Sequence, residues 1–247
     1  MKDSKKTIVL ILFKVNGLFS GNLERKALSN YIFLSHFLNE KTPSYGKRSP
    51  FIKRDVSKIS CCQSSNSQYW EFSNHIGTHV DFPFHFDESG KKLETYSAKD
   101  WIFQKPVLIE LECAPGYFIN IKDLEKHIPE KCDIVFIKTS FEKFRNEDIY
   151  WENNPGVLPE VGIWLRKNRK NLKAIGFDFI SLTSFSNKEI GGEAHKAFLN
   201  SNYEGEPLLI IEDMKLSALI SSPKSVIIAP LLIEGADGSP VTVIAEI

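Results

Sequence analysis

The sequence predicts an α/β protein built on one mixed β-sheet with flanking helices. Short runs rich in Val, Ile, Phe and Tyr, each about as long as a strand, recur along the chain of 247 residues. Helical patterns are fewer, and in the second half they alternate with these runs, an order typical of α/β proteins. No composition shift or linker divides the chain, so we expect a single domain over residues 1–247, with no role assigned to the segment 1–30.

The predicted strands, in order along the chain, are 7–13, 31–37, 69–74, 106–111, 133–139, 173–179, 207–212, 225–229 and 241–247. The strongest helical pattern spans 159–170, where Val161, Trp164 and Leu165 share one face and basic residues lie mostly on the other. Shorter helices are expected at 121–127 and 193–200. The polar segments 16–24 and 39–57 contain Gly or Pro and are predicted loops.

Charge and composition exclude several classes of partner. Lys plus Arg number 31 and Asp plus Glu also number 31, so the formal net charge is zero. This balance argues against a broad binding surface for nucleic acid or an anionic membrane, and no apolar stretch approaches the length of a membrane span. The run 7–13 follows two lysines like the start of a signal peptide, but Lys14 interrupts it, so a first strand is preferred.

The 4 cysteines include no Cys-x-x-Cys pair, which argues against a thiolate zinc site. Free, mostly buried thiols in a reducing compartment are the simplest interpretation. We therefore expect a cytoplasmic protein; its expected partner is a small-molecule substrate.

Three of the 6 histidines gather in one segment, His75-Ile-Gly-Thr-His79-Val-Asp81-Phe-Pro-Phe-His85. In a straight strand the Cα atoms of His75 and His79 would lie about 13 Å apart, whereas ligands of one ion lie about 2 Å from it. The chain must therefore bend, and Gly77 is the residue that permits a bend. We predict a turn at Gly77 that feeds a short strand and gathers two imidazoles and a carboxylate.

Two imidazoles and a carboxylate, without thiolates, are typical of a catalytic ion that keeps open coordination positions. Zinc, manganese and iron all suit this ligand set. Such an ion activates water and polarises a carbonyl, so the residues predict a metal-dependent enzyme.

The segment resembles, at every fixed position, the H-x-G-T-H-x-D-x-P-x-H pattern of the cyclase family, which includes bacterial kynurenine formamidases and isatin hydrolase. Three other stretches are similar to patterns of that family: Phe33-Leu-Ser-His36 with Thr42-Pro43 to "D-L-S-H … T-P", Gly176-Phe-Asp178-Phe-Ile-Ser181 to "G-I-D-x-x-S", and Gly235-Ala-Asp-Gly238-Ser-Pro240-Val241 to "G-x-D-G-x-P-V". The similarity thus runs from about Tyr31 to the C-terminus.

The resemblance implies a swivelling β/β/α fold and a metal site. Its implied ligands are His75, His79, Asp81, His195 and Glu212. It further implies that His85 transfers a proton. Asp178 and Ser181 follow a buried strand, and either could orient a ligand histidine. Where kynurenine formamidases carry an aromatic W-P-G-D loop, this chain has Ser44-Tyr45-Gly46-Lys47, so Tyr45 is the candidate to stack on a substrate.

The function implied is hydrolysis of a C–N amide bond, in an arylformamide such as N-formylkynurenine or in a cyclic imide or lactam. A metal-dependent cyclase or lyase acting on a carbonyl substrate is the alternative, and a catalytically silent binding protein is a third. The metal is expected to be zinc or manganese, as one ion or two. The resemblance also implies a dimer or tetramer. The loops around Tyr45 and Tyr150-Trp151 are candidate contacts, because aromatic side chains are enriched at interfaces.

The role of His85 follows from its distance along the chain. If the strand continued beyond Asp81, the Cα atoms of Asp81 and His85 would lie about 13 Å apart. We therefore predict that His85 carries a proton and is not an essential ligand.

Overall fold

The computed structural model describes residues 31–47 and 49–247, so the predicted strand 7–13 and loop 16–24 lie outside the described residues. The strands are β1 Tyr31–Phe33, β2 Ile52–Ser57, β3 Ser67–Glu71, β4 His79–Asp81, β5 Ile102–Phe103, β6 Pro106–Glu110, β7 Phe118–Ile119, β8 Ile134–Lys138, β9 Gly156–Val157, β10 Ala174–Phe177, β11 Leu209–Glu212, β12 Ser225–Pro230 and β13 Gly238–Glu246. The helices are α1 Ile121–Leu124, α2 Ile149–Glu152, α3 Pro159–Asn168 and α4 Lys188–Leu199.

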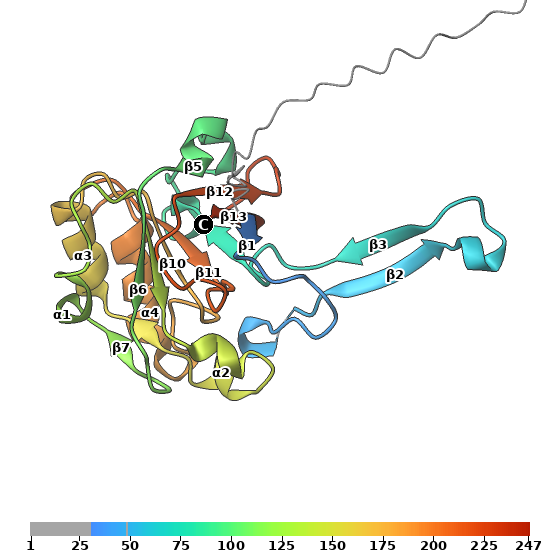
Figure 1. Ribbon diagram of the computed structural model, residues 1–247, viewed down its shortest axis with the longest axis horizontal. Helices are drawn as coiled ribbons and strands as arrows, with labels where there is room; N and C mark the ends of the chain where they lie inside the picture. The colour runs from blue at the N-terminus through green and yellow to red at the C-terminus, as the bar shows by residue number, and fades with distance from the viewer. Residues whose placement is uncertain (1–30, 48) are drawn as a thin grey trace, which may run out of the picture.

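A mixed sheet forms the centre of the molecule (Figure 1). Its strand order is β5-β12-β13-β4-β11-β10-β8-β6, and β1 pairs with β13. Strands β6, β8, β10 and β11 run parallel, whereas β4 is antiparallel to both of its neighbours, β11 and β13. The predicted α/β class with a mixed sheet and flanking helices is confirmed.

The parallel strands are buried on both faces. Along β8, Val135 and Ile137 belong to the core shared with α3 and α4, whereas Ile134 and Phe136 belong to the core on the opposite face, shared with β12 and β13. Strands covered on both faces are continuously apolar, and this is why β8 and β10 could be predicted from composition alone.

Three of the four helices were predicted, one of them with a shifted boundary, whereas the short helix α2 was not. Helix α3 lies within the predicted range 159–170 and α1 within 121–127. Helix α4 begins at Lys188, earlier than the predicted start at 193. Its first half was not predicted because Gly191 and Gly192 have low helix propensity. Among the described residues, no helix has both the length and the apolar character needed to cross a membrane.

Strands β2 and β3 form a hairpin that projects far from the sheet (Figure 1). The prediction of a loop over 39–57 is therefore wrong for Ile52–Ser57. The four inner residues of β2 are all exposed, so its sequence lacks the apolar alternation by which a half-buried strand is recognised. The tip of the hairpin carries two exposed cysteines, Cys61 and Cys62, whereas Cys113 and Cys132 are buried, so only half of the thiols follow the expected burial.

Candidate metal centre

A tight turn at Gly77 brings His75 back toward β4. The φ angle of Gly77 is 60°, and a Cβ built there would lie 2.4 Å from Cδ2 of Leu38. A positive φ costs an L-residue free energy that glycine does not incur. The bend predicted at Gly77 is therefore confirmed, and β4 starts two residues later at His79.

The sheet places His79 and Asp81 between two other segments of the site. In the antiparallel pairing of β4 with β11, the Cα partner of His79 is Glu212. On the other side of β4, Gly238 is the Cα partner of Asp81. A Cβ at Gly238 would lie 2.4 Å from Cε1 of His75, so glycine at this position leaves room for the imidazole.

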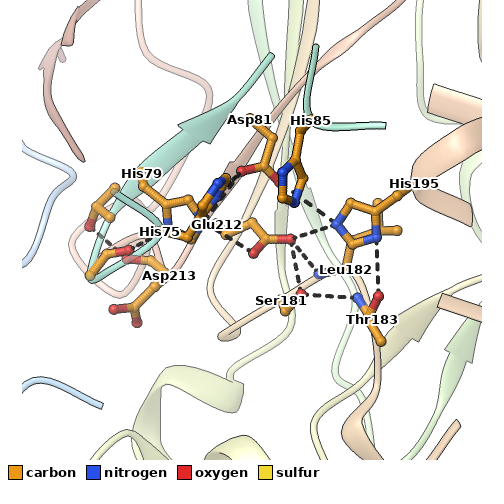
Figure 2. Close-up of polar contacts among 12 residues, drawn as sticks. His75, His79, Asp81, His85, Ser181, Leu182, Thr183, His195, Glu212 and Asp213 are labelled. Carbon is orange, nitrogen blue, oxygen red and sulfur yellow. Dashed lines mark hydrogen bonds and ion pairs between the residues drawn. The ribbon is translucent and has the colours of Figure 1, made fainter. Parts of the chain in front are cut away.

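Two imidazoles converge on two carboxylates at the centre of this arrangement (Figure 2). His79 Nε2 lies 3.4 Å from both Asp81 Oδ1 and Glu212 Oε2. From α4, His195 Nε2 lies 3.7 Å from Asp81 Oδ2 and 3.6 Å from Glu212 Oε1. All four side chains are buried.

These separations suit a shared ion better than hydrogen bonds. Hydrogen bonds between N–H and oxygen are normally about 2.7–3.2 Å long, whereas donor atoms held tetrahedrally at about 2.0–2.1 Å from one ion lie about 3.3 Å apart. The mixed N/O donor set, without thiolates, also matches a catalytic divalent site.

The outward nitrogen of each histidine is held by a backbone carbonyl. His79 Nδ1 donates to the Gly77 carbonyl oxygen at 2.8 Å, and His195 Nδ1 donates to that of Gly191 at 2.9 Å. A carbonyl oxygen can only accept, so the proton lies on Nδ1 and, in the neutral ring, the Nε2 lone pair faces the carboxylates. This arrangement is typical of metal-ligating histidines.

The Glu212 carboxylate is oriented from the segment after β10. Its Oε1 accepts from the Leu182 backbone N–H at 2.6 Å and from Ser181 Oγ at 3.2 Å (Figure 2). Ser181 thus orients a carboxylate and not a histidine, contrary to the prediction. Asp178 also fails that prediction, because its Oδ1 accepts from the Thr139 backbone and hydroxyl at 2.8 and 2.5 Å, and burial raises its pKa to about 6.

A second group of side chains surrounds Asp237, for which the sequence predicts no role. Asp237 Oδ2 lies 3.0 Å from His75 Nε2 and 2.8 Å from His85 Nδ1, so one carboxylate links both imidazoles. The other nitrogen of His75, Nδ1, lies 2.8 Å from Asp81 Oδ1. The signal for Asp237 was present in its Gly-x-Asp-Gly-x-Pro-Val segment, but nothing local indicated which residue it would meet.

His85 reaches this group by a route different from the expected one. Strand β4 ends at Asp81, and a 3-10 helix over Pro83–His85 turns the chain. The centroid of the His85 ring therefore lies only 4.2 Å from that of His75. The strand therefore does not continue to His85, because Pro83 begins a helical turn.

The charges of the centre shift its pKa values strongly in the absence of an ion. Burial lowers the pKa of His75, but Asp81 and Asp237 outweigh burial and raise it to about 10. Burial also lowers the pKa of His195, but Asp81 and Glu212 outweigh burial and raise this pKa to about 10. Against the effect of burial, the neighbouring imidazoles hold the pKa of the Asp81 carboxyl well below its usual range.

Behind the centre, a buried ion pair holds the residue after Glu212. Arg145 donates from Nε and Nη2 to the two carboxylate oxygens of Asp213 at 2.8 and 2.7 Å, and Tyr150 Oη donates to Asp213 Oδ1 at 2.5 Å. Asp213 has a φ of 49°, and its carbonyl oxygen accepts from Thr78 Oγ1 at 2.6 Å. The Asp213 carboxylate points away from the histidines (Figure 2). The network therefore holds the backbone at Thr78 and Asp213 in place, but the Asp213 carboxylate is not part of the proposed metal centre.

The centre opens into a cavity of about 370 Å³. Tyr45 lines it and packs edge-on against Phe185, with ring centroids 5.3 Å apart. Tyr150 is fully buried and faces Asp213, so it cannot be the subunit contact that the sequence analysis expected.

Comparison with known proteins places these features in a family. The family model described as "Putative cyclase" matches residues 32–183. The kynurenine formamidase of Bacillus anthracis is 28% identical over 213 residues, which cover 86% of this chain and 95% of that protein. The kynurenine formamidase of Bacillus thuringiensis subsp. konkukian is 27% identical over 218 residues, covering 88% and 98%.

Solved structures share the fold. Isatin hydrolase A from Labrenzia aggregata has a TM-score of 0.74 at 20% identity, covering 88% of this chain and 93% of that chain. Isatin hydrolase A from Ralstonia solanacearum has a TM-score of 0.71 at 19% identity, covering 87% and 91%. Because the family model matches more than half of the sequence, this chain belongs to the cyclase family.

Proposed function

We propose that this chain is a metal-dependent hydrolase that cleaves a C–N amide bond, in an arylformamide such as N-formylkynurenine or in a cyclic imide or lactam. The observation that carries the proposal is the convergence of His79 Nε2 and His195 Nε2 on the buried carboxylates of Asp81 and Glu212. The kynurenine formamidase relatives support the choice of an amide substrate.

A divalent ion, zinc or manganese, is proposed to occupy this convergence. The proposed ligands are His75, His79, Asp81, His195 and Glu212. A divalent ion supplies a Lewis acid that polarises a carbonyl and makes water a better nucleophile at neutral pH. Three overlapping groups of donor atoms, one of which joins His75, His85 and Asp237, leave room for one ion or two.

His85 is proposed to move the proton to the leaving nitrogen. Its Nδ1 lies 2.8 Å from the Asp237 carboxylate, so Nε2 is the nitrogen that can exchange a proton with a substrate. His85 lines the cavity, and Asp237 fixes its ring much as a carboxylate orients the general base of a catalytic triad. Tyr45, on the cavity wall, is proposed to contact the substrate's ring.

The test is turnover by protein purified without exposure to nickel, stripped with a chelator and reloaded with zinc or manganese. N-formylkynurenine, isatin and a simple cyclic imide are the substrates. We expect hydrolysis of at least one, dependent on the added metal. Absence of hydrolysis with either metal contradicts the proposal, and metal-dependent ring closure or elimination would support the cyclase or lyase alternative.

A homo-oligomer, dimer or tetramer, remains part of the proposal. The β2–β3 hairpin offers exposed apolar side chains for such contacts, including Val56 and Trp70, which are 69% and 59% exposed. Cytoplasmic residence is also proposed, on the basis of the four free cysteines.

A further inference from the structure

One face of helix α4 forms a wall of the cavity. Lys188, Gly192 and His195 are spaced by four and three residues, which places them on the same face of a helix. All three line the cavity. With a rise of about 1.5 Å per residue, the Cα atom of Lys188 lies about 10 Å along the helix from that of His195.

Gly192 has no packing reason to be glycine. A Cβ built on it meets no heavy atom within 4 Å, whereas a Cβ on the adjacent Gly191 would lie 2.3 Å from Cγ2 of Thr183. Glycine inside a helix is less stable than alanine, because it loses more backbone freedom on folding. Contact with Thr183 therefore explains why position 191 is glycine. No neighbour explains Gly192, which leaves open space beside the proposed metal centre and makes the helix less stable than alanine would.

Lys188 supplies a cation at the far end of this wall. Among the described residues that line the cavity, it is the only Lys or Arg. No carboxylate in the described part of the chain forms an ion pair with it, and its Nζ instead lies 3.8 Å from the centroid of the Phe185 ring. Lys188 is the first residue of α4, so the positive end of the helix dipole adds to its charge.

The opposite end of the wall is the proposed metal centre, where the buried carboxylates of Asp81 and Glu212 lie beside His195. The proposed ion offsets the charge of those carboxylates, whereas no carboxylate in the described part of the chain pairs with Lys188, so an anionic substituent is attracted to the Lys188 end. At the His195 end, Phe86 stacks on the imidazole with ring centroids 4.7 Å apart and also lines the cavity. The wall thus has a reactive end, an open middle over Gly192 and a cationic end.

We propose that the substrate lies along α4, with its scissile bond at the His195 end, its body over Gly192 and a carboxylate at the Lys188 ammonium. The inference rests on the proposed amide hydrolysis for its orientation. It makes Lys188 and Gly192 specificity-determining residues that select an elongated, anionic amide over a neutral one.

A charge-matched pair of probes tests the cationic end. One probe is an ortho-formamidophenyl ketone whose side chain ends in a carboxylate, and the other is its methyl ester. On the metal-loaded enzyme, we expect Lys188→Met to raise the KM of the carboxylate about tenfold and to change kcat and the KM of the ester by less than about twofold. The matched control is Lys196→Met, because Lys196 lies on the same helix but pairs with Glu193 outside the cavity. Equal effects of Lys188→Met on both probes, or no effect on either, would overturn the inference.

Stability and binding together test the open middle. Gly192→Ala should raise Tm by about 1–4 °C, since alanine favours the helix and meets no obstacle. Gly192→Leu should keep its metal but weaken binding of the carboxylate probe's amine product, measured by calorimetry, about tenfold or more. Unchanged binding by Gly192→Leu would show that no ligand occupies this space.

The two proposals fail in different ways. If neither formamide is hydrolysed but the carboxylate-bearing amine binds in a manner that depends on Lys188, the substrate orientation stands and amide hydrolysis does not. If both formamides are hydrolysed and the charge at Lys188 is irrelevant, hydrolysis stands and the orientation is wrong. If the amine product does not bind at all, the inference is refuted.

Discussion

Glu212 and His79 are Cα partners in the antiparallel pairing of β11 with β4, and Glu212 Oε2 lies 3.4 Å from His79 Nε2. A pairing shifted by one residue would turn Glu212 to the other face of the sheet, because side chains alternate along a strand. The register of two strands 133 positions apart in sequence (212 minus 79) therefore decides whether the proposed centre forms.

Loss of a ligand should remove the metal without unfolding the protein. We expect His79→Ala, purified without exposure to nickel, to contain little zinc or manganese by elemental analysis. Its circular dichroism should match that of the unchanged protein, because the core is large enough to fold without an ion. Full metal content in His79→Ala would contradict its proposed role.

His85 and His79 should respond differently to the same substitution. We expect His85→Gln to keep nearly all of its metal while turnover falls roughly 100-fold or more, as when a general acid–base is removed. His79→Gln should lose metal and turnover together. If His85→Gln loses metal as completely as His79→Gln, then His85 is a ligand, in the group that it forms with His75 and Asp237.

Metal uptake should release protons. In the metal-free protein the pKa values of His75 and His195 are both raised to about 10, so both rings are cationic at neutral pH. A ligand imidazole must be neutral, so binding at pH 7 should release about two protons or more, and metal affinity should rise as pH rises toward 10. Calorimetry in buffers of different ionisation enthalpy measures this number, and a release of zero would show that these histidines are not ligands.

The same shifts predict how pH affects the metal-free fold. A histidine whose folded pKa is raised stabilises the fold fully below its unfolded pKa of about 6.5, and that contribution is lost as pH rises through about 10. Urea unfolding of metal-free protein should therefore show a decline in stability over this interval. A free energy of unfolding that increases over the same interval would contradict the raised pKa values.

The ion pair behind the centre should contribute to stability. Arg145→Met leaves the Asp213 carboxylate, whose side chain is 1% exposed, without its cation. We expect a loss of about 3 kcal/mol in urea unfolding, because an unpaired buried charge is costly. The double variant Arg145→Met/Asp213→Asn should recover part of this loss, since no lone charge remains. A change below about 0.5 kcal/mol in Arg145→Met would show that water solvates Asp213.

Local sequence was sufficient for the main elements and for three of the five proposed ligands. The apolar runs of β8, β10 and β11 indicated a buried sheet, and the spacing of His75, His79 and Asp81 required the bend found at Gly77. These features depend on side-chain periodicity and backbone sterics, which act over a few residues and can be recognised without a partner.

The tertiary structure alone decided the features that depend on distant partners. Asp237 joins His75 and His85 only because β13 pairs with β4, and Ser181 orients Glu212 only because β10 lies beside β11. Strand β2 has no buried residue and is defined by its pairing with β3. Hydrogen bonds between strands and carboxylate–imidazole contacts form between groups that recur along the chain, so local sequence cannot specify which two groups will meet. The packing of the whole sheet, which sets the register of its strands, decides this.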